Sequence, residues 1–296
     1  MNQFFELLLS GISLGFVYAL IALGFVMIFK STRVVNFAHG SLVLIGAYVI
    51  ARTQGSLGFV PAVLIGVAFT ALLAMLLQVV ILRRIRGSSQ DILAICTIGI
   101  DILLATELTR RIGSKVLDIG DPWNDKVVHF LGLGIPEARV AAGIVAALLL
   151  AAFVTAFKFT DWGVAMRSAA SDGAAAAMMG IRLGRVAAFA WAVAGALAAV
   201  GGVFFTTFPT PGVDASVGLS ALAAFPAAIL GGLDSIAGAV VGGLIIGVVV
   251  TLTAGYQDNL AFLGRGLSDV MPYVVMVAVL LVRPAGLFGT REMTRV

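Results

Sequence analysis

The sequence is short of charge. Only 11% of its 296 residues are Asp, Glu, Lys or Arg, whereas 60% are hydrophobic and the mean hydropathy is +1.09. Soluble domains carry about 25% charged and about 45–50% apolar residues, so this composition excludes a soluble domain of this size. A lipid bilayer is the solvent that fits it.

Cysteine and histidine are scarce as well. The one cysteine, Cys96, lies inside an apolar run, which excludes a disulfide within the chain and indicates a small packing residue. The two histidines, His39 and His129, fall on opposite sides of the membrane in the topology predicted below, so no metal site is expected.

Lysine is also rare. None of the four lysines follows a glycine in a phosphate-binding loop, so another polypeptide must handle any ATP. The net charge of +4 comes mostly from arginines scattered between apolar runs, which is typical of loop anchors and not of a nucleic-acid-binding face. No set of His, Cys, Ser and carboxylate side chains converges at one depth, which argues against an intramembrane enzyme with catalytic residues.

Long apolar runs predict an all-α integral membrane protein, a polytopic helical bundle forming a single domain over residues 1–296. The runs lie near 7–29, 34–51, 60–82, 90–106, 140–157, 187–208, 217–233, 236–254 and 268–282, which makes eight or nine crossings. With nine crossings, twelve basic residues fall on one face and seven on the other. The positive-inside rule then puts the N-terminus outside and the C-terminus inside. The first run is too long for a signal sequence, so we expect it to be retained.

The second run is interrupted by polar residues at its start. Residues 36–41 (NFAHGS) contain Asn36, His39, Gly40 and Ser41, which a continuous lipid-facing helix would not carry. Ser41 suits the N-cap of a half-helix over residues 42–50. A plainer interpretation is that Asn36 and His39 are interfacial residues that headgroups and water satisfy.

A similar break follows 178 residues after Asn36. Three residues separate Asp214 from Gly218, just as three residues separate Asn36 from Gly40, and residues 209–212 (PTPG) precede the segment. Interrupted spans at matching places in two halves of a chain indicate a transport pathway, because the ends of half-helices offer free N–H groups at membrane depth. Such a helix start would stabilise the carboxylate of an amino acid.

Asp101 is the one acid near the middle of an apolar run. An ionised acid there costs about 2.5–3.5 kcal/mol on insertion scales, so its side chain should face protein or a water-filled path. It could hold a substrate ammonium group or a proton, or it could pair with a buried hydroxyl or arginine in a structural contact. Glycines at helical spacing between 231 and 247 indicate close helix packing, with substrate contact as the alternative.

Residues 158–186 form the longest connection on the predicted inner face. Its Ala-Met stretch favours a short amphipathic helix that Ser171 or Asp172 opens and Gly180 closes. This helix is either a connector resting on lipid headgroups or a knob that docks on a cytoplasmic partner, with Met179 as an adaptable contact.

Four stretches of the chain resemble the permease subunits of branched-chain amino-acid ABC importers, specifically the shorter of the two permeases. They are residues 15–24 (GFVYALIALG), 36–40 (NFAHG), 175–181 (AAAMMGI) and 231–242 (GGLDSIAGAVVG). The resemblance implies a fold like that of type II ABC importer permeases, with discontinuous helices, and a location in the bacterial inner membrane. It also implies that Asp172, Ala175, Ala176, Met179, Gly180 and Ile181 belong to the coupling segment that docks on an ATPase.

The same resemblance implies an assembly of five parts. This chain would pair with a second, related permease as a heterodimer, with two ATP-binding subunits and with a periplasmic substrate-binding protein. ATP and Mg²⁺ would bind to the ATPases, and this chain would hold no cofactor. The substrate would be a branched-chain amino acid, although related permeases extend to urea, amides and other amino acids. A rival hypothesis is an ion-coupled secondary transporter in which Asp101 or Glu107 carries a proton.

Overall fold

The computed structural model describes residues 2–85, 89–120, 122–123, 126–130, 133–207, 212–259 and 266–289. Four basic residues that support the predicted topology, Arg86, Arg265, Arg291 and Arg295, lie outside these ranges, as does most of the PTPG segment. The side chain of His129 is likewise not described.

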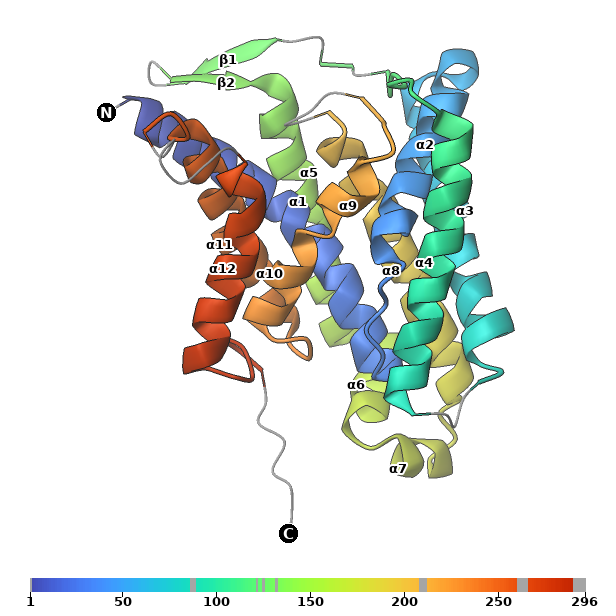
Figure 1. The fold of residues 1–296 in the computed structure, drawn as a ribbon. Helices are drawn as coiled ribbons and strands as arrows, with labels where there is room; N and C mark the ends of the chain where they lie inside the picture. Colours follow the sequence, from blue (N-terminus) through green and yellow to red (C-terminus); the bar gives the residue numbers. More distant parts are fainter. Residues whose placement is uncertain are drawn as a thin grey trace.

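The described chain is a helical bundle with one small hairpin (Figure 1). Its first half contains α1 (Asn2–Thr32), α2 (His39–Leu57), α3 (Phe59–Leu76) with the π-helix η1 (Leu77–Leu82), and α4 (Gln90–Ile112). The middle contains strands β1 (Val127–Phe130) and β2 (Leu133–Pro136), then α5 (Glu137–Phe159), α6 (Asp161–Ser171) and α7 (Gly173–Met178). The last part contains α8 (Leu183–Phe205), α9 (Val217–Ala221), α10 (Ala224–Gly231), α11 (Ile236–Gly255) and α12 (Leu267–Val282).

Six helices in the described ranges are long and apolar enough to cross a membrane, namely α1, α3 with η1, α4, α5, α8 and α11. The pair α9 and α10 and the helix α12 are apolar but shorter. α1 begins at the end of the molecule that carries β1 and β2 and runs toward the end that carries α6 and α7 (Figure 1). The number of crossings and their direction in the membrane remain predictions.

Two elements were not expected from the sequence. The strands β1 and β2 pair antiparallel, with Val127 opposite Pro136 and Phe130 opposite Leu133, in the segment between the apolar runs 90–106 and 140–157. The second unexpected element is the helix α6, which precedes the predicted Ala-Met helix. Thr160 caps α6 by accepting a hydrogen bond from the N–H of Gly163 at 3.3 Å. Neither element is long enough to cross a membrane.

The core forms around α1 and α8. Leu20 and Leu23 of α1 and Trp191 of α8 are almost completely buried. The outer helices instead expose large apolar side chains, such as Leu64 of α3 (65% exposed) and Leu148 of α5 (65% exposed). Water would not favour such surfaces, whereas lipid tails satisfy them because the backbone polar groups are already bonded within each helix.

The bundle contains an internal repeat that extends the short match found in the sequence. The helices α1, α2, α3 and α4 correspond in order to α8, the pair α9 and α10, α11 and α12. Val217 follows His39 by 178 residues, Ile236 follows Phe59 by 177, and Leu267 follows Gln90 by 177. The packing corresponds too, because α1 packs on α11 as α8 packs on α3, and α2 packs on α3 as α10 packs on α11.

The second set of helices is inverted relative to the first. α8 starts beside α7 and runs back toward the β1–β2 end, opposite to α1 (Figure 1). Glycines allow both equivalent helix pairs to pack closely: a Cβ on Gly247 of α11 would lie 2.3 Å from the Cα of Gly15, and a Cβ on Gly195 of α8 would lie 2.6 Å from the Thr70 carbonyl oxygen. Close packing of small residues is therefore the observed role of these glycines.

Candidate functional site

The two interrupted segments meet in the middle of the bundle. A Cβ on Gly40, in the first turn of α2, would lie 2.5 Å from the carbonyl oxygen of Gly218, in the first turn of α9. A Cβ on Gly218 would in turn lie 3.4 Å from the carbonyl oxygen of Gly40. The backbones of the two helix starts are thus in direct contact, and only glycine fits at Gly40 without a shift.

Both segments open their helices with the same turn. The side-chain oxygen of Asn36 accepts a hydrogen bond from the N–H of Ala38 at 3.1 Å, and that of Asp214 accepts one from the N–H of Ser216 at 2.6 Å. In each segment the helix then begins at the third residue after the turn residue, His39 or Val217, whose N–H donates to the carbonyl oxygen of Asn36 or Asp214. Asn36 and Asp214 are therefore equivalent in structure as well as in spacing.

The prediction that Ser41 caps a half-helix over residues 42–50 is wrong. α2 begins at His39, its N-cap residue is Ala38, and it continues to Leu57. Because the turn at Asn36 already opens the helix, the Ser41 hydroxyl is not needed as a cap and can bond to another helix. It donates to the Asp101 carboxylate on α4 at 2.5 Å.

Asp101 is thus paired with a hydroxyl group and lies half-buried against α2. One turn earlier on α4, the Thr97 hydroxyl accepts from the N–H of Phe37 at 3.2 Å, and its one proton faces the carbonyl oxygens of Ala94 at 2.8 Å and Val35 at 3.2 Å. Thr97 and Asp101 together hold the extended segment and the first turn of α2. Nothing in the local pattern singles out Thr97, because a threonine inside an apolar helix is common and usually bonds its own backbone.

His39 points away from Asp101, into the core. It is completely buried, its Nε2 lies 3.1 Å from the carbonyl oxygen of Ile21, and its ring lies 4.4 Å from that of Phe25. A Cβ on Gly24 would lie 2.5 Å from the His39 ring. In this conformation the side chain of His39 therefore fixes α2 on α1.

Glu107, the other acid considered as a proton carrier, lies near the far end of α4. It pairs with Arg110 at 2.9 Å and with Arg111 at 2.6 Å; the two arginine side chains are mostly exposed and that of Glu107 is 44% exposed. Glu107 thus belongs to a surface ion-pair group, apart from the contact between α2 and α9.

The predicted coupling segment folds as α7. Asp172 caps it, since its Oδ1 accepts from the N–H groups of Ala174 at 2.9 Å and Ala175 at 3.0 Å. Gly180 ends it with a φ of +86°, and the N–H of Ile181 donates to the carbonyl oxygen of Ala176 at 3.0 Å. This pair of features is a Schellman motif, which agrees with the predicted start and stop signals.

The helix α7 has one buried and one exposed side. Ala176 is 4% exposed, whereas Met178 and Met179 are 83% and 84% exposed. Two large apolar side chains are therefore exposed on α7 and its C-cap, and α7 lies with α6 at one end of the molecule (Figure 1).

The C-terminal end of α1 connects this region to the extended segment. Nη2 of Arg33 donates to the carbonyl oxygen of Ala170 on α6 at 2.8 Å, and Nζ of Lys30 donates to that of Asp234 at 2.7 Å. Arg33 has a φ of +56°, which is uncommon for a residue other than glycine. The chain from Arg33 to Gly40 is thus bonded at one end to α6 and packed at the other on α9.

The predicted site residues consequently form two groups. Asn36, Gly40, Ser41 and Asp101 come together at the start of α2 with Gly218, whereas the coupling residues gather on α7. Comparison with known proteins identifies the chain that carries both groups. Residues 7–280 match the family described as branched-chain amino acid transport system / permease component. The chain belongs to this permease family.

Curated relatives match this permease over nearly its whole length. The high-affinity branched-chain amino acid transport system permease protein LivH of Escherichia coli (strain K12) is 31% identical over 99% of this chain and 98% of its own. BraD of Pseudomonas aeruginosa, described in the same terms, is 29% identical over 99% and 98%. A probable LivH of Methanocaldococcus jannaschii is 31% identical over 91% and 88%. No solved structure matches the chain.

Family membership and the six apolar helices make this permease a multi-pass protein of the inner membrane. The stretches that carry the resemblance now have physical roles. Gly24 leaves room for the ring of His39, and Gly242 leaves room for the carbonyl oxygen of Ala227 on α10. Ser235 caps α11 by accepting from the N–H of Gly238 at 3.0 Å.

Proposed function

We propose that this permease moves branched-chain or related small aliphatic amino acids into the cell as one subunit of an ABC importer. The observation that carries the proposal is the contact between Gly40 and Gly218, where two equivalent helix starts from the two halves of an inverted repeat meet. In transporters built from inverted repeats, substrate binds at discontinuous helices near the repeat interface. The names of the curated relatives supply the substrate class.

The start of α2 has the chemistry that an amino acid requires. Within the described residues, none of the main-chain hydrogen bonds outside the regular helices is donated by Gly40 or Ser41. Their N–H groups are therefore suited to donate hydrogen bonds to a substrate carboxylate when α9 moves away from α2. The Asp101 carboxylate, half-buried beside Ser41, is suited to hold the substrate ammonium group.

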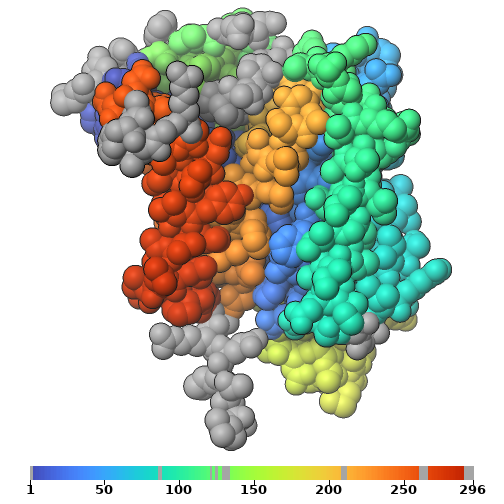
Figure 2. Space-filling view, viewed as in Figure 1, coloured from blue at the N-terminus to red at the C-terminus, as the bar shows by residue number. Residues whose placement is uncertain are grey.

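Two other helices flank this region. In the space-filling view α9, α10 and part of α2 lie recessed between α12 and α4 (Figure 2). α4 and α12 are equivalent in the repeat, and both expose large apolar side chains, such as Leu103 (72%) and Leu281 (82%). We propose that a second, related permease covers this recess, so that the pathway lies between the two subunits.

The energy of ATP hydrolysis would reach the permease through the coupling residues on α7. The exposed Met178 and Met179 of α7 form a compact apolar projection of the kind that fits a groove on a partner. We propose that α7 docks on one of two ATP-binding subunits, which hold ATP and Mg²⁺, and that Arg33 passes its movement to the segment that opens α2. A periplasmic substrate-binding protein would deliver substrate to the β1–β2 end, where the proposed outer face lies.

The experiment that tests this function compares two energy sources in proteoliposomes. The permease is reconstituted with the permease and ATPase subunits that copurify with it, and uptake of radiolabelled leucine is measured with its binding protein outside. Uptake should require ATP inside and should persist after an ionophore removes the proton gradient. Uptake that does not depend on ATP and that stops when the proton gradient is removed would instead support the rival hypothesis, a proton-coupled secondary transporter.

A further inference from the structure

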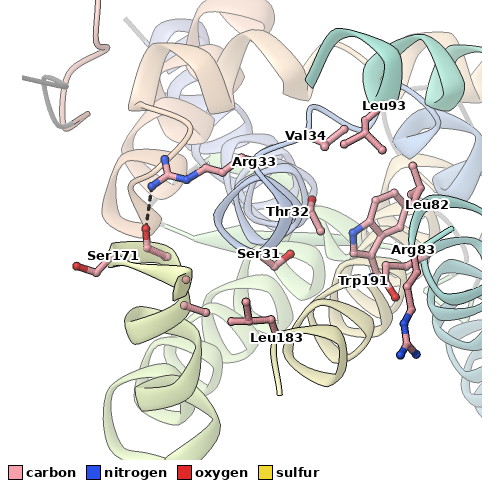
Figure 3. Close-up of a pocket in the computed structure, with 14 residues that line it drawn as sticks. Ser31, Thr32, Arg33, Val34, Leu82, Arg83, Leu93, Ser171, Leu183 and Trp191 are labelled. Atoms are coloured by element: carbon pink, nitrogen blue, oxygen red, sulfur yellow. Dashed lines mark hydrogen bonds between the residues drawn. The ribbon is translucent and has the colours of Figure 1, made fainter. Parts of the chain in front are cut away.

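A cavity of about 340 Å³ lies beside the coupling segment and is separate from the proposed pathway. It is enclosed by the C-terminal end of α1, the π-helix η1, the start of α4, α6 and α8 (Figure 3). None of the residues assigned above to the pathway lines it. Binding cavities for small molecules span about 300–1,000 Å³, so this cavity suits a ligand at the small end of that range.

Two deeply buried polar groups face the cavity without a partner. Trp191 is 1% exposed and Gln78 is 2% exposed, and within the described part of the chain neither the indole Nε1 nor the Gln78 Oε1 has a hydrogen-bond partner. In Figure 3 the indole nitrogen of Trp191 points toward the interior of the cavity. Buried polar groups are almost always paired, so an unpaired donor and an unpaired acceptor on one cavity indicate a ligand that offers both an acceptor and a donor.

The backbone at Gln78 supports this interpretation. Gln78 lies in η1, where the α3 helix changes to π-type winding over Leu77–Leu82. Such wide turns are rare and are frequent at functional sites, because they redirect a side chain at a cost in helix geometry. In this chain the π-helix carries Gln78, and also Leu82, which lines the same cavity.

The remaining lining defines the charge and polarity of the ligand. Arg33 and Arg83 are the charged residues on it, and among the described lining residues there is no carboxylate. Val34, Leu82 and Leu93 provide an apolar side. The cavity therefore combines two arginines, one buried donor, one buried acceptor and an apolar wall.

We propose that this cavity binds a free α-amino acid with an aliphatic side chain from the side of the molecule that carries α7. The ammonium group would donate to Oε1 of Gln78, the carboxylate would accept from Nε1–H of Trp191 near the arginines, and the side chain would lie against Leu82 and Leu93. This arrangement pairs both orphaned groups with one small molecule.

Binding there would act on the coupling segment. Ala169, Ala170, Ser171 and Gly173, which lead into α7, line the cavity together with α1 and α8. An occupant would hold α6 and α7 on α1 and so slow any motion that α7 transmits. If the proposed import function holds, on which this step rests, the imported amino acid thus restrains its own uptake.

Fluorescence of Trp191 tests binding directly. The chain has three tryptophans, so W123F/W162F leaves Trp191 alone in the full-length permease, purified in nanodiscs of anionic lipid. Leucine should change its emission saturably. Q78L should weaken this binding at least tenfold, whereas Q78E should keep it, and S41A in the proposed pathway should not alter it. 4-Methylpentanoate, which lacks the ammonium group, should bind at least tenfold more weakly than leucine.

Several results would overturn the proposal. The first is an emission that leucine does not change, as expected of a cavity that holds only water. The second is leucine binding that is equally tight in Q78L and the parent, and the third is 4-methylpentanoate binding as tightly as leucine. The fourth is loss of leucine binding in S41A but not in Q78L. Loss of binding in phosphatidylethanolamine discs would also overturn it, because a zwitterionic lipid headgroup would then be the occupant.

Uptake separates this proposal from the proposed function. In the proteoliposomes described above, leucine preloaded on the α7 side should reduce initial uptake at least twofold, and both Q78L and W191F should remove that reduction. ATP-driven uptake that preloaded leucine does not affect would contradict the cavity proposal alone. Uptake without any need for ATP would contradict the proposed function instead.

Discussion

The carbonyl oxygen of Gly218 lies directly against Gly40, so that a Cβ on Gly40 would come within 2.5 Å of it. These two glycines occupy matching positions in the inverted repeat, four residues after Asn36 and Asp214. Their contact joins the two halves of the permease at the helix starts proposed to bind substrate.

Gly40→Ala should impair both folding and uptake. The added Cβ has no room against the backbone of α9, and such overpacking typically costs about 1–3 kcal/mol. Gly55→Ala is the matched control on the same helix, because a Cβ there meets nothing within 4 Å. Thermal unfolding in detergent and leucine uptake should both fall for Gly40→Ala and remain unchanged for Gly55→Ala; equal behaviour of the two variants would refute the close contact.

Asp101→Asn should retain ATP-driven uptake at a reduced rate, because the amide oxygen can still accept from Ser41.

Ser41→Ala should lower stability by about 1–3 kcal/mol, since it leaves the half-buried Asp101 carboxylate without its donor. Glu107→Gln, on the exposed ion-pair group, should be nearly neutral. Complete loss of uptake in Asp101→Asn, together with parent uptake that collapses with the proton gradient, would favour the secondary transporter.

Asp172→Ala should loosen α7 and slow uptake without unfolding the bundle. Loss of an N-cap costs about 0.5–2 kcal/mol, and asparagine caps a helix about as well as aspartate. Amide exchange at Ala174 and Ala175, which donate to Asp172, should therefore accelerate in Asp172→Ala but not in Asp172→Asn. An uptake rate that Asp172→Ala leaves unchanged would show that coupling does not depend on an ordered α7.

Gly247→Ala and Gly195→Ala should both destabilise the permease, because each adds a Cβ to one of two equivalent helix pairs, α1 with α11 and α8 with α3. Gly99→Ala on α4, where a Cβ meets nothing within 4 Å, should be neutral or slightly stabilising because alanine favours helices. The melting temperatures of the three variants check this. A stable Gly195→Ala would mean that the two halves do not pack in the same way.

The sequence predicted most of the helices because hydropathy and length are properties of each segment by itself. The ends of α7 were predictable for the same reason, since Asp172 and Gly180 act on their own backbone. The match between Asn36 and Asp214 was visible as spacing, and the structure shows that it belongs to a repeat of four helical elements.

The remaining features depend on contacts between distant segments. Ser41 was misassigned as a cap because its partner, Asp101, lies 60 residues away on another helix. Thr97 and the contact between Arg33 and Ala170 are likewise long-range, and nothing in the local pattern distinguishes them. The buried pair of Gln78 and Trp191 could not be found from the sequence either, because their significance lies in the absence of a partner within the described fold.

The most direct test of the central claim, that this permease receives its energy through α7, is crosslinking at Met179. Met179→Cys places a thiol on a side chain that is 84% exposed, and the lone native cysteine is first replaced by Cys96→Ala. In inner-membrane vesicles, a short bifunctional reagent should join Met179→Cys to the ATPase subunit and stop leucine uptake. Labelling of that thiol only from the periplasmic side, or a crosslink that leaves uptake unaffected, would contradict the account.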